Sequence, residues 1–249
     1  MTNYEMIVLD LDGTLTNRDK VITPRTKQAL MSAQEQGKIV VLASGRPTAG
    51  VEPLAKELEL ERFGSYILSY NGGMITNCRT GEVVFASQIP LAANERIIGL
   101  AEEHRVDILT YEETQIITNN DQCPYAVMES NINHLPLVQV ESMKDYVRFE
   151  VPKFLMLDDG DYLVTVEPLV KAALGKNFSV YRSEPYFLEV MPKGIASAGG
   201  AGDDEGSDDR LRRRLQRPDH GSVRRTGRCH GECGSAPAQS RGLYHAVQQ

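Results

Sequence analysis

Short apolar runs alternate with segments of helical spacing over the first 70 residues of the chain, and no other feature limits its possible folds as much. A continuous apolar run of this length is typical of a strand that is buried on both faces. The runs are residues 6–9, 38–43 and 66–70. Between them, residues 24–36 and 51–58 carry apolar side chains at helical intervals. The order strand, helix, strand, helix, strand predicts a parallel sheet with right-handed crossover connections.

Both ends of the first helix are marked in the sequence. Thr23 is a good N-cap residue, and Pro24 suits the first helical position, where an N–H group would have no helical partner. Gly37 suits the left-handed conformation that ends many helices. We therefore expect this helix to lie between Thr23 and Gly37.

The pattern changes between residues 82 and 189, where helical segments alternate with short strands. The helices are expected at 91–104 and at 162–174, with a start or kink at Pro168, and the clearest strands at 106–110, 115–118 and 153–157. A strand at 186–190 leads back to the first unit. We therefore expect an α+β unit at 82–189 that is inserted into a core formed by residues 1–81 and 190–195.

The composition changes again after residue 195. Nine of the 21 glycines and half of the arginines lie in residues 196–249, whereas no lysine does. Only five large aliphatic side chains occur there, which is too few to offset the entropy lost on folding. Composition therefore predicts that residues 196–249 are an atypical, disordered tail.

Two carboxylates lie two residues apart directly after the first apolar run, in Asp10-Leu11-Asp12-Gly13-Thr14. On an extended segment they project to the same side, at the carboxyl end of the strand, where open α/β sheets bind ligands. Gly13 allows a sharp turn there. Close carboxylates repel, so they share a proton or hold a cation such as Mg²⁺. One could then attack phosphorus while the other moves a proton.

These residues closely resemble the first motif of the haloacid dehalogenase superfamily, in its phosphatase branch. Ser44-Gly45-Arg46-Pro47, after the second strand, resembles the second motif of that superfamily. Asn71-Gly72-Gly73 and residues 185–190 further resemble the Cof-type sugar-phosphate phosphatases of cap subclass IIB. The resemblance covers about residues 3–195. It implies a Rossmann-like α/β core with an inserted α+β cap, in which the carboxyl-terminal part of the core is here atypical or missing.

The resemblance also implies roles for individual residues. Asp10 would be the nucleophile, forming an aspartyl-phosphate, and Asp12 the general acid and base. Asp10 would also ligate Mg²⁺ through its carboxylate, and Asp12 through its backbone carbonyl. The phosphate-binding residues would be Leu11, Ser44 and Gly45; Thr14, Arg46 and Asn71 would support the site or act at a hinge. The substrate would be a small phosphorylated metabolite, expected to be a sugar phosphate, and the cap would close over its sugar.

Two further motifs of the family are missing from the sequence. A phosphate-binding lysine is expected near position 197, where this chain has Ser197, and we interpret Lys193 as a surface residue. A Gly-Asp-x-x-Asn-Asp strand end should supply another magnesium carboxylate. Gly202-Asp203-Asp204 and Asp208-Asp209 are acidic, but no apolar strand precedes them, so we do not assign them this role.

A shifted reading frame accounts for these departures. Residues 211–221 can be encoded by codons that, read from the second base, give Cys-Gly-Asp-Gly-Phe-Asn-Asp-Leu-Thr-Met, which contains the missing motif. The same shift turns residues 230–233 into Met-Glu-Asn-Ala and the chain end into Asp-Tyr-Ile-Thr-Leu-Ser-Asn. These three fragments resemble the family's ending in the expected order. Our hypothesis is that a frameshift near Ile195 replaced the natural carboxyl-terminal segment, and that catalysis is impaired in this chain.

Other readings of the tail are weaker. His220, Cys229, His230, Cys233 and His245 match no standard zinc-binding spacing, and the arginines at 212–214 and 224–225 have no aromatic partners for binding a nucleic acid. A net charge of −7 also argues against nucleic-acid binding, and no run approaches the roughly 20 apolar residues of a membrane helix. Four scattered cysteines indicate a reducing, cytoplasmic setting. The sequence predicts no oligomeric state.

Two alternative functions remain open at this point. A phosphomutase or phosphotransferase would use the same Asp10, and would pass the phosphoryl group to a second sugar instead of water. A non-catalytic phosphate-binding module, such as a receiver-like domain, would also use Mg²⁺ and an aspartate. Receiver domains carry an adjacent acid pair on the first strand and a phosphorylated aspartate on a later one, which Asp10 and Asp12 do not match.

Overall fold

The computed structural model describes residues 5–195, which form two sheets with their helices. The first sheet has the strand order β1-β2-β3-β4-β5. Its elements are β1 (Met6–Asp10), α1 (Pro24–Glu35), β2 (Ile39–Ala43), α2 (Thr48–Glu57), α3 (Leu60–Phe63), β3 (Tyr66–Ser69), the 3₁₀ turn η1 (Tyr70–Gly72), β4 (Met74–Asn77) and β5 (Val83–Ala86). Strands β1, β2 and β3 are parallel, as the sequence predicts, whereas β4 and β5 are antiparallel additions.

The first helix begins and ends where its sequence signals indicate. The Thr23 hydroxyl accepts a hydrogen bond from the Thr26 N–H at 3.2 Å, and Pro24 is the first helical residue. The helix ends at Glu35, and Gly37 has the expected positive φ of 81°. Apolar residues of β1, β2, α1 and α2 form one buried cluster, with Leu11, Val40, Leu42 and Val51 fully buried.

The second sheet has the order β10-β11-β9-β6-β7-β8. Its elements are α4 (Leu91–Glu103), β6 (Asp107–Glu112), β7 (Gln115–Thr118), α5 (Pro124–Asn133), β8 (Leu137–Gln139), α6 (Met143–Tyr146), β9 (Phe154–Leu157), α7 (Gly160–Leu174), the 3₁₀ turn η2 (Gly175–Asn177), β10 (Phe178–Glu184) and β11 (Phe187–Pro192). The helix expected at 162–174 is present as α7, but of the two alternatives for Pro168, a start or a kink, the start is wrong, because α7 begins at Gly160 with Asp159 as its N-cap. The expected α/β fold class is confirmed by these two sheets and their helices. The sheets do not divide at residues 82 and 189, because β5 belongs to the first sheet and β11, which runs to Pro192, belongs to the second.

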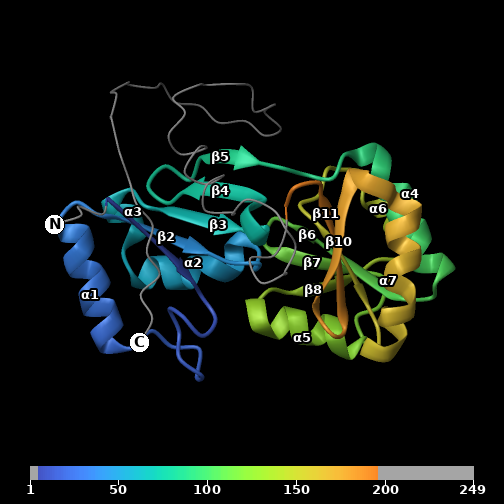
Figure 1. The fold of residues 1–249 in the computed structure, drawn as a ribbon, viewed down its shortest axis with the longest axis horizontal. Coiled ribbons are helices and arrows are strands. Elements are labelled where there is room, and N and C mark those ends of the chain that lie inside the picture. Colours follow the sequence, from blue (N-terminus) through green and yellow to red (C-terminus); the bar gives the residue numbers. More distant parts are fainter. Residues whose placement is uncertain (1–4, 196–249) are drawn as a thin grey trace.

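The second sheet separates two apolar layers. Helices α4, α6 and α7 lie on the face that is turned away from the first sheet (Figure 1). On β9 the side chains alternate, so that Phe154 and Met156 pack toward these helices while Leu155 and Leu157 join a cluster containing Tyr70 of the first unit. The two units therefore share a buried junction.

Strand β1 lies at an edge of the first sheet. Within residues 5–195 it pairs with β2 alone. No helix in this part of the chain is both long and apolar enough to cross a membrane.

Candidate active site

The predicted site residues meet at the carboxyl ends of β1 and β2. Asp10 is the last residue of β1 and pairs with Ala43, the last residue of β2, so Ser44 follows at the same edge. The chain turns after Asp12 because Gly13 adopts a φ of 84°. The Leu15 N–H then bonds the Asp10 carbonyl at 3.0 Å, which closes the turn. The two carboxylates and the Ser-Gly-Arg loop are thus neighbours.

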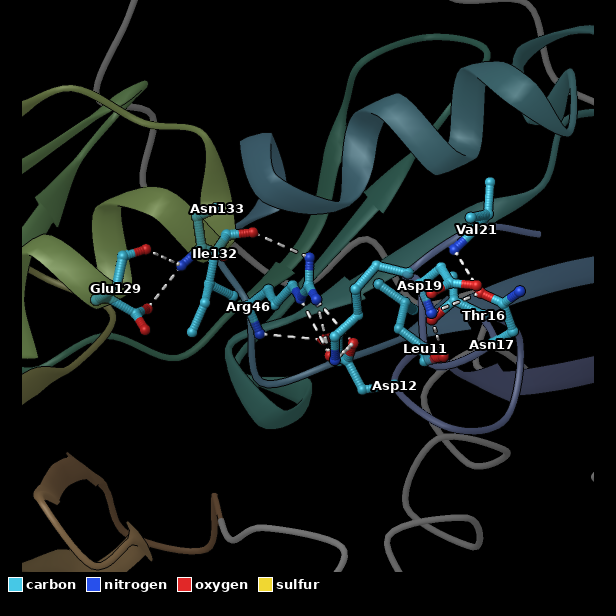
Figure 2. Close-up of polar contacts among 12 residues, drawn as sticks. Leu11, Asp12, Thr16, Asn17, Asp19, Val21, Arg46, Glu129, Ile132 and Asn133 are labelled. Carbon is cyan, nitrogen blue, oxygen red and sulfur yellow. Dashed lines mark hydrogen bonds and ion pairs between the residues drawn. The ribbon is translucent and has the colours of Figure 1, made fainter.

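The guanidinium group of Arg46 donates hydrogen bonds to the Asp12 carboxylate through two of its nitrogens. Its Nη2 lies 2.8 Å from Asp12 Oδ1, and its Nε lies 3.2 Å from Oδ2. Nη1 of the same group donates to the Ile132 carbonyl of α5 at 3.2 Å, so Arg46 links the acid pair to the inserted unit (Figure 2). The Lys20 Nζ adds a second cation at 2.7 Å from Asp12 Oδ1.

The pKa of the Asp10 carboxyl is raised, whereas that of the Asp12 carboxyl is lowered. Partial burial and the nearby charge of Asp12 raise the pKa of Asp10, against the lowering effect of the Leu11 N–H and Arg46. Burial also raises the pKa of Asp12, but bonds to Lys20 and the charge of Arg46 outweigh it, so this pKa is lowered. The contacts with Lys20 and Arg46 therefore favour the ionised form of Asp12.

Replacement of Arg46 by glutamine is expected to raise the pKa of Asp12. Arg46 lowers this pKa by its charge and its hydrogen bonds, so their loss favours the protonated form. Titration of the Asp12 carboxyl carbon by NMR, in the absence of metal, measures the shift. Arg62→Gln, which removes an exposed arginine paired with Glu59, is the control. An Asp12 pKa that is the same in Arg46→Gln and in the parent chain would contradict this electrostatic account.

The loop after β2 carries Ser44 and Gly45 and follows the strand that pairs with the strand ending at Asp10. The Ser44 hydroxyl accepts a hydrogen bond from the Arg46 N–H at 3.2 Å, which leaves its own proton available to a phosphate oxygen. A Cβ atom on Gly45 would lie 2.7 Å from the Asn71 Oδ1, so a larger residue would have to displace the Asn71 amide group. The Ser44 hydroxyl and the close packing of Gly45 against Asn71 are thus the features of this loop that the structure shows.

Turn η1 is hydrogen-bonded to this loop. Tyr70 and Asn71 both adopt left-handed conformations, with φ of 52° and 55°. Their N–H groups donate to the carbonyls of Arg46 and Ser44, each at 3.0 Å. Non-glycine residues in this conformation are strained and persist only where the surroundings fix them. The two N–H bonds, made from this left-handed turn, thus hold the Ser-Gly-Arg loop in place.

Some of the supporting contacts differ from those expected. Within residues 5–195 the Thr14 side chain makes no hydrogen bond, whereas the buried Thr16 hydroxyl donates to the Leu11 carbonyl at 3.0 Å. Lys20 and Ile132 were not predicted at all. Lys20 has a positive φ of 60° in the loop after Asp12, and no sequence signal connects Ile132 to a carboxylate 120 positions earlier.

The donor set at the strand ends suits Mg²⁺. This ion keeps several waters and binds proteins through one or two carboxylates together with substrate phosphate. Burial and the nearby charge of Asp12 raise the pKa of the Asp10 carboxyl, and a bound cation would offset the repulsion between the two carboxylates. In the described part of the chain, no group of three or more His, Cys, Asp or Glu side chains is arranged so that it could hold a metal ion by itself. The alternative tail sites, from Ser197 to His245, lie outside the described residues.

Comparison with known proteins agrees with this geometry. Residues 7–200 match the family model of haloacid dehalogenase-like hydrolases. A Bacillus subtilis protein named "Putative phosphatase YxeH" is 30% identical over 204 residues, which cover 80% of this chain and 73% of the relative. A haloacid dehalogenase-like hydrolase from Bacteroides thetaiotaomicron has 41% identity and a TM-score of 0.75, covering 79% of this chain and 74% of that one.

A structure described as the subclass IIB sugar phosphatase BT4131 has the same fold. Its TM-score is 0.63 at 22% identity, and the match covers 85% of this chain and 76% of that one. The family-model match, the identity to YxeH and the paired strand ends that carry Asp10 and Ser44 agree with one another. The chain belongs to the haloacid dehalogenase-like hydrolases, a family whose members include phosphatases.

Proposed function

We propose that this site performs Mg²⁺-dependent phosphoryl transfer from a small phosphorylated metabolite to water, with an aspartyl-phosphate intermediate on Asp10. The observation that carries the proposal is the position of Asp10 and Ser44 at the ends of two paired parallel strands, with Asp12 two residues further on. This position supports the proposal because it brings to one sheet edge the types of group that could serve as nucleophile, proton carrier and hydrogen-bond donors.

The proposed first step breaks the bond between phosphorus and the leaving oxygen while Asp10 Oδ bonds to phosphorus. Asp12 gives its proton to the leaving oxygen, and Ser44 and Gly45 donate hydrogen bonds to the phosphoryl group. In the second step, Asp12 takes a proton from water as that water attacks phosphorus and Asp10 leaves. Mg²⁺, held by the Asp10 carboxylate and the Asp12 carbonyl, would neutralise charge on the phosphoryl oxygens.

Arg46 has to release Asp12 before that proton can be delivered. The ion pair with Arg46 keeps Asp12 ionised in the substrate-free site. An incoming phosphoryl group is a competing anion for the same guanidinium. Because Arg46 also contacts the Ile132 carbonyl, its release links substrate binding to the position of the inserted unit, which we propose acts as the cap.

The substrate class that we favour is a sugar phosphate, because the residues around Asn71 and at 185–190 resemble the Cof-type phosphatases. The free thiols Cys78 and Cys123 are in keeping with a cytoplasmic location. In this chain Ser197 stands where the family's pattern has its lysine, and we propose that turnover is slow for that reason.

The parent chain is expected to hydrolyse p-nitrophenyl phosphate slowly, and only with Mg²⁺ present. Asp10 and Asp12 alone bind the ion weakly, and one missing cationic donor costs about 10²–10³-fold in rate. Release of p-nitrophenol measures this, with and without EDTA. Rapid turnover, or slow turnover that EDTA leaves unchanged, would contradict the proposal.

A further inference from the structure

A buried ion pair in the inserted unit lies directly behind the Ser-Gly-Arg loop. Lys153 precedes β9 and Glu189 is in β11, and their side chains are only 4% and 5% exposed, with Lys153 Nζ 3.3 Å from Glu189 Oε1. Charges are rarely buried so completely, because they lose their hydration. Such a pair persists only where further polar contacts satisfy it.

Those further contacts are made to the other unit. Lys153 Nζ donates to the Gly45 carbonyl at 3.2 Å. Glu189 Oε2 accepts from the Asn71 Nδ2 at 3.0 Å. The same Asn71 Nδ2 lies 2.8 Å from the Tyr181 hydroxyl, which in turn lies 3.3 Å from Glu189 Oε2. One connected network therefore joins Gly45 and Asn71 to three residues of the inserted unit.

Sheet geometry explains why these two charges face the loop. On β11, Leu188 and Val190 pack toward the helices of the inserted unit, so Glu189 points to the opposite face, toward Tyr70 and its neighbours. Lys153 shares this direction with Leu155 on the adjacent strand. The centre of the Tyr111 ring lies 5.6 Å from Lys153 Nζ, so this cation also lies over the face of an aromatic ring.

The contact of Lys153 completes a set of three. The carbonyls of Ser44, Gly45 and Arg46 accept from the Asn71 N–H, from Lys153 Nζ and from the Tyr70 N–H, respectively. These three bonds fix the orientation of the peptide groups at Ser44, Gly45 and Arg46. Of the three donors, only Lys153 comes from outside the first unit.

We infer that Lys153 and Glu189 are positioning residues, through which the inserted unit fixes the orientation of the Gly45 peptide and hence the phosphate-binding loop. This role rests on the proposed function of Ser44 and Gly45. It assigns to the inserted unit a second task besides covering the substrate, because it holds the loop even when no substrate is bound.

The test compares Lys153→Met with the double variant Lys153→Met/Glu189→Gln, and uses Lys171→Met as a matched control. Lys171 belongs to the inserted unit and is paired with Glu167, but it is half exposed and lies on α7, on the face of the second sheet that is turned away from the first sheet (Figure 1). The single variant leaves Glu189 buried without its cation, whereas the double variant removes both charges and keeps an oxygen for Asn71. Thermal unfolding reports the stability of each variant.

The diagnostic signals are the Gly45 amide resonance in proton–nitrogen correlation NMR and the affinity for inorganic phosphate with Mg²⁺. We expect the double variant to unfold near the parent temperature, yet to shift the Gly45 resonance and bind phosphate about 10-fold more weakly, since the charged donor to Gly45 is gone. Lys171→Met should change neither signal.

A double variant with the parent's Gly45 resonance would overturn the positioning role, because the ion pair would then serve stability alone. The resonance does not depend on ligand binding. A parent chain that binds no phosphate would therefore count against the proposed function, while the Gly45 resonance still decides the role of Lys153 and Glu189.

Discussion

Returning the chain to the alternative reading frame after Ile195 is expected to raise the rate of p-nitrophenyl phosphate hydrolysis by about 1,000-fold or more. Deleting one nucleotide near this codon would restore the Gly-Asp-x-x-Asn-Asp motif that is hidden in residues 211–221. The gain has two sources: a cationic donor to the phosphoryl group and another carboxylate for Mg²⁺. Each acts on charge that develops in the transition state.

Kinetics with Mg²⁺, comparing the parent and the frame-restored chain, measure this gain. A chain in which residues 196–249 are scrambled serves as control, and its turnover should match that of the parent. Sequencing of the coding DNA gives an independent check. A coding strand whose shifted frame lacks the motif, or a frame-restored chain as slow as the parent, would contradict the frameshift hypothesis.

The frame-restored chain is also expected to lose about 10⁴-fold or more of its activity when Asp10 is replaced by asparagine. Asparagine keeps the shape of the side chain but has neither the charge nor the nucleophilic oxygen needed to attack phosphorus. It also withdraws a carboxylate from the proposed Mg²⁺ site. The kcat of the purified variant, measured at saturating Mg²⁺, reports the loss.

Asp19→Asn is the matched control, since Asp19 lies in the loop that follows the acid pair and has no proposed role in the chemistry. Its kcat should stay close to that of the frame-restored chain. If Asp10→Asn retained most of the activity, the nucleophile would have to be another residue. If both variants lost activity alike, the effect would lie in the loop structure.

The position of Asp10 and Ser44 at the same sheet edge could be predicted from the sequence, because neighbouring parallel strands end at a common edge. Strand β1 and strand β2 were recognised as continuous apolar runs, and their order along the chain fixes which residues follow each end. Asn71 was also singled out, although its two separate contacts, through its N–H to Ser44 and through its amide to Glu189, emerge only from the structure.

The contacts between the two units could not be predicted in this way. Arg46 reaches Ile132, and Lys153 reaches Gly45, across more than 80 positions of the chain, and no local pattern specifies how the sheets pack. A lysine ahead of an apolar strand is usually exposed. Glu189 is a weak sequence indication of such a contact, because a carboxylate inside the apolar run of β11 needs a polar partner once it is buried.

The most direct test of the account is the detection of a phosphoryl group on Asp10. The frame-restored chain, mixed with p-nitrophenyl phosphate and Mg²⁺ and quenched in acid during turnover, is digested and analysed by mass spectrometry. We predict that the peptide containing Asp10 gains one phosphoryl group, which hydroxylamine removes and Asp10→Asn prevents. Continued turnover with no phosphoryl group on that peptide, or with the group on a different residue, would contradict the assignment of Asp10 as the nucleophile.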